Sequence, residues 1–326
     1  MSSKVAIIGI TGATGFVGGA LVDYLLANTA SALRIAVRDN RPSHRDRVQS
    51  FEVGTLGPEN RWSDFVSGAD VIVHCAARVH VLNESGSTPL LEYQRANVQG
   101  TLNLAEQAAA AGVRRFVFIS SVKVNGEETQ PGHAFEADGP ARPADPYGIS
   151  KMQAEQALRE VASRTGMEVV IIRPVLVYGP GVKANFLNMM RWLDKGVPLP
   201  LGAIDNRRSL VALDNLVDLI ATCTTHPAAA NQTFLASDGR DLSTTELLRQ
   251  MGAALGKPAR LLPVPVWLLR ACAKLVGKQS VSQRLCGSLQ VDIAKTRSLL
   301  GWTPPVTIEE AMKKTAQHYQ EHKQHA

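Results

Sequence analysis

Gly9-Ile10-Thr11-Gly12-Ala13-Thr14-Gly15-Phe16-Val17-Gly18 is the stretch that decides the fold of this chain. The apolar run of residues 5–10 predicts a buried strand, and apolar residues at helical spacing after the glycines predict a helix: Val17, Leu21, Leu25 and Leu26. Gly12 would permit a tight turn, Gly15 would let backbone amides reach an anion at the helix N-terminus, and Gly18 would let the helix lie close on the sheet. This order predicts a dinucleotide-binding unit, although the spacing is Gly-x-x-Gly-x-x-Gly.

The composition limits the class of protein. The 326 residues are 45% hydrophobic, enough for one large α/β domain and a smaller one. Four scattered cysteines predict a reducing, cytoplasmic location, with no metal site and no disulfide. The first strand starts almost at Met1, so we expect no signal peptide. No apolar run approaches the ~18 residues of a membrane span, and residues 261–276, with two prolines and two basic residues, predict a core or interfacial helix.

The charge pattern suggests a partner. The net charge is +6, and arginines cluster early in the chain and pair at residues 114–115 and 207–208; the early cluster is Arg34, Arg38, Arg41, Arg45 and Arg47. A basic balance suits a polyanion. Aromatic residues are only 5% of the chain and none interleaves with these arginines, so a phosphorylated small molecule is favoured over nucleic acid.

The second predicted strand, residues 33–37, ends at Arg38-Asp39. In a dinucleotide-binding sheet this strand ends at the adenosine ribose, where an acidic residue binds the 2′-hydroxyl of NAD and an arginine accommodates the 2′-phosphate of NADP. Arg38 comes first and more arginines follow, so NADP(H) is the favoured cofactor and NAD(H) the alternative. Residues 70–77 predict another strand, whose small Ala76 and Ala77 would let a cofactor pass over its end.

Predicted strands alternate with helices through the first half of the chain, at residues 5–10, 33–37, 48–53, 70–77, 115–121 and 168–172. This alternation predicts an α/β fold, a Rossmann doubly wound parallel sheet with right-handed crossovers. We expect residues 1–180 to form an NAD(P)-binding Rossmann domain, with a return to the sheet around residues 208–237. Residues 181–326 would form a smaller, mostly helical substrate domain. The polar tail from His318 is expected to fray.

Tyr147-Gly-Ile-Ser-Lys151 places a phenol and an ammonium one turn apart on a predicted helix. A nearby positive charge favours the phenolate, so Tyr147 could exchange a proton with an alcohol or carbonyl near neutral pH. Ser121, at the end of a predicted strand, would add a hydrogen bond to the same oxygen. Tyr319-x-x-x-Lys323 matches the same pattern, but it lacks a glycine turn and a strand-end serine, and it predicts a solvated helix face.

The motifs Thr11-Gly12-x-x-Gly15-x-x-Gly18, Asn97-x-x-Gly100-Thr101, Ser121 and Tyr147-x-x-x-Lys151 together resemble the extended short-chain dehydrogenases/reductases. The resemblance covers nearly the whole chain and implies Ser-Tyr-Lys catalysis on NAD(P). Tyr147 would be the acid/base, Lys151 would hold the nicotinamide ribose and lower the pKa of Tyr147, and Ser121 would bind the reacting oxygen. The implied cofactor residues, besides Tyr147, Lys151 and Arg38, are Gly12, Gly15, Phe16, Val17, Gly18, Ala76, Ala77 and Asn97.

The second half resembles the nucleotide-sugar branch of that family, namely UDP-sugar 4-epimerases, dehydratases and 4-keto-sugar reductases. This resemblance implies diphosphate contacts from Asn185, with its neighbour Phe186, from Arg208 and from Arg284. Arginine suits that role because its planar guanidinium binds phosphate oxygens in pairs. The chain departs from the epimerase pattern at Thr55, Asn125, Leu176, Ser209 and Leu210.

These departures and Arg38 favour an enzyme that reduces the C4 carbonyl of a UDP-4-keto-6-deoxy-(N-acetyl)hexose for surface-polysaccharide synthesis. A UDP-glucose or UDP-N-acetylglucosamine 4-epimerase with tightly bound NAD stays open as an alternative. So do an NADPH-dependent reductase of a non-sugar ketone and a non-catalytic NADP-binding protein. We expect a UDP-sugar partner, no nucleic acid, no membrane span, and a homodimer formed through the helices near residues 94–111 and 147–165.

Overall fold

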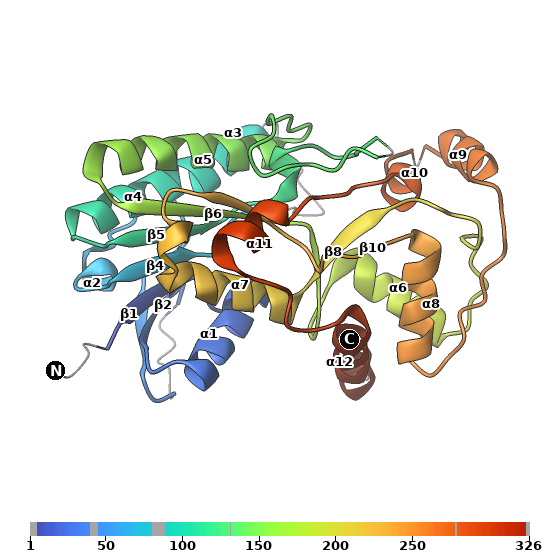
Figure 1. The fold of residues 1–326 in the computed structure, drawn as a ribbon, viewed down its shortest axis with the longest axis horizontal. Helices are drawn as coiled ribbons and strands as arrows, with labels where there is room; N and C mark the ends of the chain where they lie inside the picture. Colours follow the sequence, from blue (N-terminus) through green and yellow to red (C-terminus); the bar gives the residue numbers. More distant parts are fainter. Residues whose placement is uncertain (1–4, 40–44, 80–88, 131, 278, 324–326) are drawn as a thin grey trace.

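The large sheet has seven parallel strands in the order β3-β2-β1-β4-β5-β6-β9 (Figure 1). This computed structural model describes residues 5–39, 45–79, 89–130, 132–277 and 279–323. The chain moves outward from β1 in one direction to β3 and in the other to β9, so the order reverses between β1 and β4. The strands are β1 Ile7–Thr11, β2 Ala32–Val37, β3 Val48–Glu52, β4 Val71–His74, β5 Arg115–Ile119, β6 Glu168–Pro174 and β9 Thr233–Ala236. The predicted Rossmann fold is confirmed.

Helices cover both faces of this sheet because its strands are apolar on both sides. In β5, Val117 and Ile119 pack with α1 and α7, whereas Phe116 and Phe118 point into the layer of α2, α4 and α5. These helices are α1 Phe16–Asn28, α2 Ser63–Val66, α4 Gly100–Ala110, α5 Pro146–Thr165 and α7 Leu213–Thr225. Three helical segments follow one another here, α3 Pro89–Tyr93, the π-helix η1 Gln94–Gln99 and α4, and the helix expected near residues 94–111 is the last two of them. Single 3-10 turns lie at η2 Val122–Val124 and η3 Pro227–Ala229.

The second half of the chain builds a separate layer beside the strand ends of the large sheet (Figure 1). A small sheet of order β10-β8-β7 and three helices enclose a second apolar cluster, which includes Phe186, Leu248 and Tyr319. The strands are β7 Leu176–Tyr178, β8 Arg208–Ala212 and β10 Asp241–Leu242, and the helices are α6 Ala184–Asp194, α8 Thr244–Ala254 and α12 Ile308–His322. The remaining helices are α9 Val266–Leu275, α10 Gln279–Cys286 and α11 Ala294–Leu300. Sequence patterns missed this small sheet because its strands are too short to show an alternation.

The return of the chain from the small sheet to the large one is divided among three elements. β8 pairs with β7 and β10 in the small sheet. α7 then contacts α1, and β9 pairs with β6 at the edge of the large sheet. The strand predicted near residues 232–236 is therefore β9.

The C-terminal tail corrects two predictions. Helix α12 continues to His322, and a capping box formed by Thr307 and Glu310 starts it. Tyr319 is buried in the second apolar cluster, and its hydroxyl donates to Asp194 Oδ2 at 3.3 Å. The prediction of a solvated Tyr319 was wrong, and residues 318–322 continue the helix, because apolar residues one turn apart along α12 pack on α8. Residues 324–326 of the expected fraying tail lie outside the described residues.

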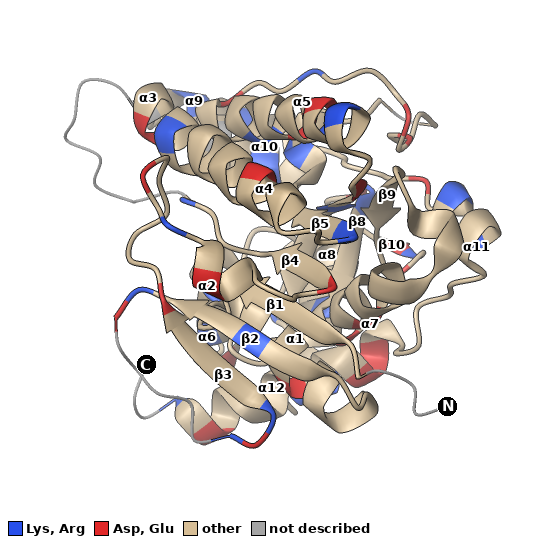
Figure 2. Ribbon diagram, turned by 90° about the vertical axis from the view of Figure 1, so that its left-hand side faces the viewer, with Lys and Arg blue, Asp and Glu red and all other residues tan. Residues whose placement is uncertain are grey.

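The early arginine cluster is not one anion-binding patch. Arg34 donates to the backbone carbonyls of Asp64 and Phe65, both at 3.2 Å, and Arg47 donates to Thr29 O and Leu26 O at the end of α1. Cations near a helix C-terminus stabilise its exposed carbonyls. Figure 2 shows Lys and Arg interspersed with Asp and Glu over this side of the molecule. Arg41 lies outside the described residues, and Arg38 is exposed at the end of β2.

Candidate active site

The glycine turn lies at the carboxyl end of β1, where the strand order reverses. Gly12 has φ +70°, and a Cβ there would lie 2.7 Å from the Ala76 amide nitrogen. A Cβ on Gly18 would lie 2.7 Å from the Gly12 carbonyl carbon, so a larger residue would push α1 off the turn. Gly15 caps α1 without a side-chain hydrogen bond, and the first turn, which includes Phe16 and Val17, has no acidic residue. The helix start therefore presents amides and a positive dipole to the strand ends.

A buried chain of hydrogen bonds fixes the neighbouring end of β4. Thr11 Oγ1 contacts His74 Nδ1 at 2.6 Å and accepts from the Ala76 amide at 3.2 Å, while His74 Nε2 contacts Thr101 Oγ1 at 3.0 Å. Burial, and then Lys151, lowers the pKa of His74 to about 3, so this ring stays neutral. Ala76 and Ala77 follow directly and are half-buried. Sequence reasoning did not find His74, because an isolated histidine in an apolar strand carries no functional signal.

Asn97 makes buried contacts within the protein. Its side chain is buried, accepts from the Arg78 amide at 2.8 Å and donates to Arg78 O at 3.0 Å and Ser150 Oγ at 3.1 Å. The π-helix η1 carries it, and the wider turn of that helix aims the amide at the segment after β4. Asn97 thus holds residues 76–78 against α5. Through these bonds Asn97 positions the residues after β4, and its expected contact with the cofactor stays a prediction.

Lys151 and Tyr147 lie on one face of α5, beside the end of β5. The Lys151 ammonium is buried, donates to Ile119 O at 2.8 Å, and lies 4.4 Å from the centre of the Phe118 ring and 6.0 Å from that of Tyr147. Ser121 follows β5 and caps η2, where its Oγ accepts from the Lys123 amide at 3.2 Å. The start of α5 lies so close to η2 that a Cβ on Gly148 would be 2.9 Å from Lys123 O. The three predicted catalytic residues therefore come from two elements in direct contact.

The electrostatics of this pair differ from the prediction. Burial lowers the pKa of Lys151 to about 8, with Cys75 and Glu155 opposing that shift. Burial, followed by the charge of Asp145 and the nearby Tyr93, raises the pKa of Tyr147 above its ordinary value. Without a bound molecule Tyr147 is thus protonated, whereas the sequence predicted a lowered pKa. Positive charge must be added near the phenol before it can act as a base.

A buried ion pair behind the site was also missed by sequence reasoning. Arg173 at the end of β6 binds Glu155 on α5 through two guanidinium nitrogens, Nε at 2.9 Å and Nη2 at 2.5 Å. Ser120 donates to the same carboxylate at 2.5 Å, and Asn125 Oδ1 accepts from Arg173 at 3.1 Å. Asn125, one of the departures from the epimerase pattern, is therefore a structural partner of Arg173. The network ties the ends of β5 and β6 to α5.

The predicted substrate residues fall into two groups. Arg208 on β8 donates to the carbonyls of Arg284 at 3.0 Å and Gly287 at 3.1 Å, so the end of α10 holds its guanidinium. The Arg284 side chain and Asn185 are exposed. Phe186 is buried, and its ring stacks on Tyr178 with centroids 5.5 Å apart. This packing corrects the expectation for Phe186, whose ring is part of the core.

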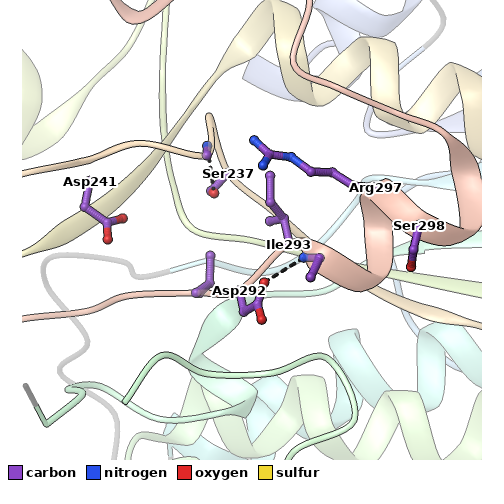
Figure 3. A pocket seen from close by; sticks show the side chains of 9 residues that line it. Ser237, Asp241, Asp292, Ile293, Arg297 and Ser298 are labelled. Carbon is purple, nitrogen blue, oxygen red and sulfur yellow. Dashed lines mark hydrogen bonds between the residues drawn. The ribbon is translucent and has the colours of Figure 1, made fainter. Parts of the chain in front are cut away.

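A pocket of about 480 Å³ lies elsewhere, between α11 and the segment after β9 (Figure 3). Its two carboxylates already have partners: Asp241 accepts from Ser209 at 2.5 Å, and Asp292 from the Ala294 amide at 2.7 Å. None of the predicted site residues lines it. Geometry therefore places the candidate site at the glycine turn and α5.

The residues at the strand ends fit a nicotinamide dinucleotide. Gly12 and Gly18 let α1 start directly against the ends of β1 and β4, since a Cβ at either would meet backbone atoms there. The first amides of α1 carry no capping side chain, and the buried Lys151 ammonium has the carbonyl of Ile119 beside it. Among the described residues, no group of three or more His, Cys, Asp or Glu side chains could hold a metal ion. No helix within the described ranges is long and apolar enough to cross a membrane. Fold and site together define an extended short-chain dehydrogenase/reductase, an enzyme class that uses nicotinamide cofactors.

Comparison with known proteins identifies the family. The chain belongs to the NAD dependent epimerase/dehydratase family, whose model matches residues 8–236. It is 50% identical over 309 residues to a UDP-glucose 4-epimerase of Vibrio cholerae, covering 94% of each chain. It is 28% identical to the N-acetyl-alpha-D-glucosaminyl-diphospho-ditrans,octacis-undecaprenol 4-epimerase of Escherichia coli O157:H7, over 95% of this chain and 94% of the other. The fold is similar to that of the UDP-glucuronic acid 4-epimerase of Bacillus cereus in complex with NAD, with TM-score 0.77, 19% identity, and coverage of 97% and 99%.

Proposed function

We propose that this enzyme is a 4-epimerase of sugar diphosphates, with UDP-glucose or UDP-N-acetylglucosamine as substrate. The 50% identity to a UDP-glucose 4-epimerase over nearly both whole chains is the observation that carries the proposal. It replaces the 4-keto-sugar reductase favoured by the sequence departures. Two of those departures have structural explanations, since Asn125 binds Arg173 and Ser209 binds Asp241. These two departures therefore do not distinguish a reductase from an epimerase.

In this proposal the described residues divide the work around C4 of the sugar. The glycine turn would hold the pyrophosphate of NAD, and the oxidised cofactor would supply a hydride acceptor for C4 and a positive charge. Tyr147 takes the proton of the C4 hydroxyl and later returns it, and Ser121 holds that oxygen with a hydrogen bond. Lys151, fixed by Ile119 O, would hold the nicotinamide ribose, and the positive charge of the oxidised cofactor would oppose the raised pKa of Tyr147. Arg208 and Asn185 bind the diphosphate while the sugar turns over.

The test is interconversion without added cofactor. Purified enzyme would be incubated with UDP-glucose, UDP-galactose and their N-acetyl forms, and C4 epimers would be separated by chromatography. Tyr147→Phe should lower turnover by about 10²–10⁴-fold, the usual contribution of a general acid/base. Tyr319→Phe is the matched control, because that tyrosine lies in the same sequence pattern but belongs to the second apolar cluster. A sugar diphosphate on a polyprenol is a further substrate to assay, given the Escherichia coli relative.

Reduction of a UDP-4-keto-6-deoxy-sugar stays as the second candidate because Leu176, which replaces the epimerase asparagine, is exposed at the substrate side. The assay for it follows NADPH absorbance with the keto-sugar nucleotide. NADPH consumption there, without interconversion of the UDP-hexoses, would establish the reductase. If the protein is inactive in both assays but UDP still raises its melting temperature, it is a non-catalytic binding protein. If it is inactive in both assays and UDP does not raise the melting temperature, a non-sugar ketone is the substrate to assay.

We also propose NAD(H) as the resident cofactor, supported by the NAD dependent family and by the NAD-bound Bacillus cereus neighbour. Arg38 and Asp39 are both exposed at the end of β2, so either could meet the adenosine ribose. If Asp39 reads the 2′-hydroxyl, Asp39→Ala should weaken NAD binding about tenfold or more, the scale of a charge-assisted hydrogen bond. Arg38→Ala should then leave NAD binding unchanged. Isothermal titration of both variants with NAD and NADP decides which cofactor the end of β2 selects. Selective loss of NADP binding in Arg38→Ala would restore the NADP(H) assignment.

The arrangement of the whole enzyme completes the proposal. Residues 1–180 would hold the cofactor and residues 181–326 the substrate, with β9 serving the cofactor side. A homodimer would form through the helices near residues 94–111 and 147–165, and the enzyme would work in the cytoplasm, where nucleotide sugars are made. Light scattering of the purified protein tests the dimer.

A further inference from the structure

Helix α9 lies at the end of the molecule far from β1 and β2 (Figure 1), and several of its large apolar side chains are exposed. Six of the thirteen large apolar side chains that are exposed in the described chain lie within residues 262–281. We define the α9 surface as these six residues: Leu262, Trp267, Leu268, Leu275, Val276 and Val281. Trp267 is 70% exposed and Leu275 87% exposed. Exposed large apolar side chains concentrated on one segment of a folded protein indicate a site of interaction.

Packing within the chain does not explain this helix. The inner side of α9 is half-buried, where Val266 and Leu269 touch the second apolar cluster, and no residue of α9 is fully buried. Backbone bonds fix the preceding segment: Leu262 donates to Leu199 O at 2.8 Å and Leu199 donates to Arg260 O at 2.9 Å. The sequence predicted a core or an interfacial helix over residues 261–276. Because no residue of α9 is fully buried, we take the second of these two roles, a helix at an interface.

The charge around α9 selects the partner. Residues 247–291 contain seven basic residues and no aspartate or glutamate; the seven are Arg249, Lys257, Arg260, Arg270, Lys274, Lys278 and Arg284. On α9 itself, Arg270 and Lys274 are exposed next to the apolar side chains. A second copy of this chain would place the same cations face to face across a twofold axis, which opposes self-association. Exposed apolar side chains that include a tryptophan, with Arg270 and Lys274 exposed on the same helix, are the composition of helices that lie in an anionic lipid interface.

We propose that the α9 surface docks the enzyme on an anionic phospholipid bilayer. Trp267, Leu268 and Leu275 enter the headgroup boundary, and Arg270 and Lys274 contact lipid phosphates. The surface adjoins the substrate side, because the carbonyls of Arg284 and Gly287 at the end of α10 hold the Arg208 guanidinium. Docking would therefore bring the diphosphate end of the candidate site next to the membrane. This inference rests on α9 alone and stands whichever sugar reaction the enzyme performs.

The first experiment is co-sedimentation of the full-length enzyme with vesicles of phosphatidylcholine, or of equal parts phosphatidylcholine and phosphatidylglycerol. Binding should require the anionic lipid and weaken with salt. We expect vesicle binding to fall by about tenfold or more in each of two double variants, Trp267→Gln/Leu275→Gln and Arg270→Gln/Lys274→Gln. Matched controls are Trp192→Gln/Val197→Gln, which removes exposed apolar side chains outside the surface, and Arg164→Gln/Lys313→Gln, which removes exposed cations on other helices. The controls should bind like the parent enzyme.

Tryptophan fluorescence gives a second, independent readout. Trp62 and Trp302 are buried, whereas Trp267 and Trp192 are exposed. On anionic vesicles the emission should shift to shorter wavelength and be quenched by brominated lipids in the parent enzyme and in Trp192→Phe, but not in Trp267→Phe. Equal vesicle binding by the Trp267→Gln/Leu275→Gln variant and its control would overturn the proposal. So would a change in oligomeric mass of that variant without lipid binding by the parent, which would assign the surface to protein contacts.

Discussion

Gly18 and Gly19 are neighbours in α1 and both face backbone atoms, but only Gly18 lies too close to them to accept a Cβ. Its Cβ would collide with the Gly12 carbonyl, whereas a Cβ on Gly19 would lie 3.3 Å from Ala13 O. Gly18→Ala should therefore destabilise the fold by about 1–3 kcal/mol, the range of overpacked sites, and should abolish cofactor binding. Gly19→Ala should change stability little. Urea unfolding and NAD titration compare the two, and equal behaviour of both variants would contradict the role assigned to the glycine turn.

Lys151 makes stability depend on pH. The unfolded chain holds the lysine proton up to about pH 10.5, but burial lets the folded protein release it near pH 8, so between these values the contribution of Lys151 to unfolding free energy rises with pH. The full rise is at most about 3 kcal/mol. Lys151→Met should abolish turnover and flatten this part of the profile. Urea unfolding at several pH values checks it, with the exposed Lys313→Met as control; an unchanged slope in Lys151→Met would refute a lowered pKa.

At the scale of elements, the Glu155–Arg173 pair joins α5 to the ends of β5 and β6. The pair is almost fully buried, so removing one partner leaves an unpaired charge. We expect Arg173→Met to lower the unfolding free energy by about 3–5 kcal/mol, and the double variant Glu155→Leu/Arg173→Met to lose much less. Denaturant titration of the single and double variants measures the difference. Additive losses would mean that the pair is not a coupled unit.

The π-helix η1 shows why element boundaries matter for the site. A helical pattern over residues 95–111 is visible in the sequence, but the wider turn at residues 94–99 is not. That turn directs Asn97 to Arg78 and Ser150. The wider turn of η1 thus decides which residues the Asn97 side chain contacts, and the sequence pattern does not show that turn.

At the scale of the molecule, both halves of the chain contribute side chains to the apolar cluster beneath the large sheet. Residues 289–302 contribute Leu289, Ile293 and Trp302 to the cluster beneath the large sheet, and Trp302 Nε1 donates to Asp218 at 2.7 Å. The segment between η2 and α5 is also held by the C-terminal part, since the Thr129 amide donates to Ser288 O and the Phe135 amide donates to Gln290 O. A functional division at residue 180 is therefore not a division between independent folding units.

A fragment of residues 1–180 tests this sharing of the core. It lacks β9, which pairs with β6, and α7, which covers α1. It should show no cooperative thermal transition by circular dichroism, because large apolar areas of β6 and α1 would meet water. The full chain should unfold in one transition. A sharp transition with NAD binding in the fragment would show instead that the first half folds alone.

The sequence by itself determined the class of fold, the glycine turn, the α5 helix with Tyr147 and Lys151, and the family. These features are local: a strand, a turn with obligatory glycines and a helix are written in consecutive residues, and their spacing requires no distant partner. The same locality explains the correct prediction of β3 and β9 as strands.

Only the tertiary structure decided what depends on distant residues. Burial sets the pKa values of Tyr147 and Lys151, and burial arises from packing that no short window contains. The partners of Arg173 lie 18 and 48 residues away, and that of Tyr319 lies 125 residues away. The exposure of α9 likewise follows from what the rest of the chain leaves uncovered, because an apolar helix reads the same in a sequence whether another element covers it or not.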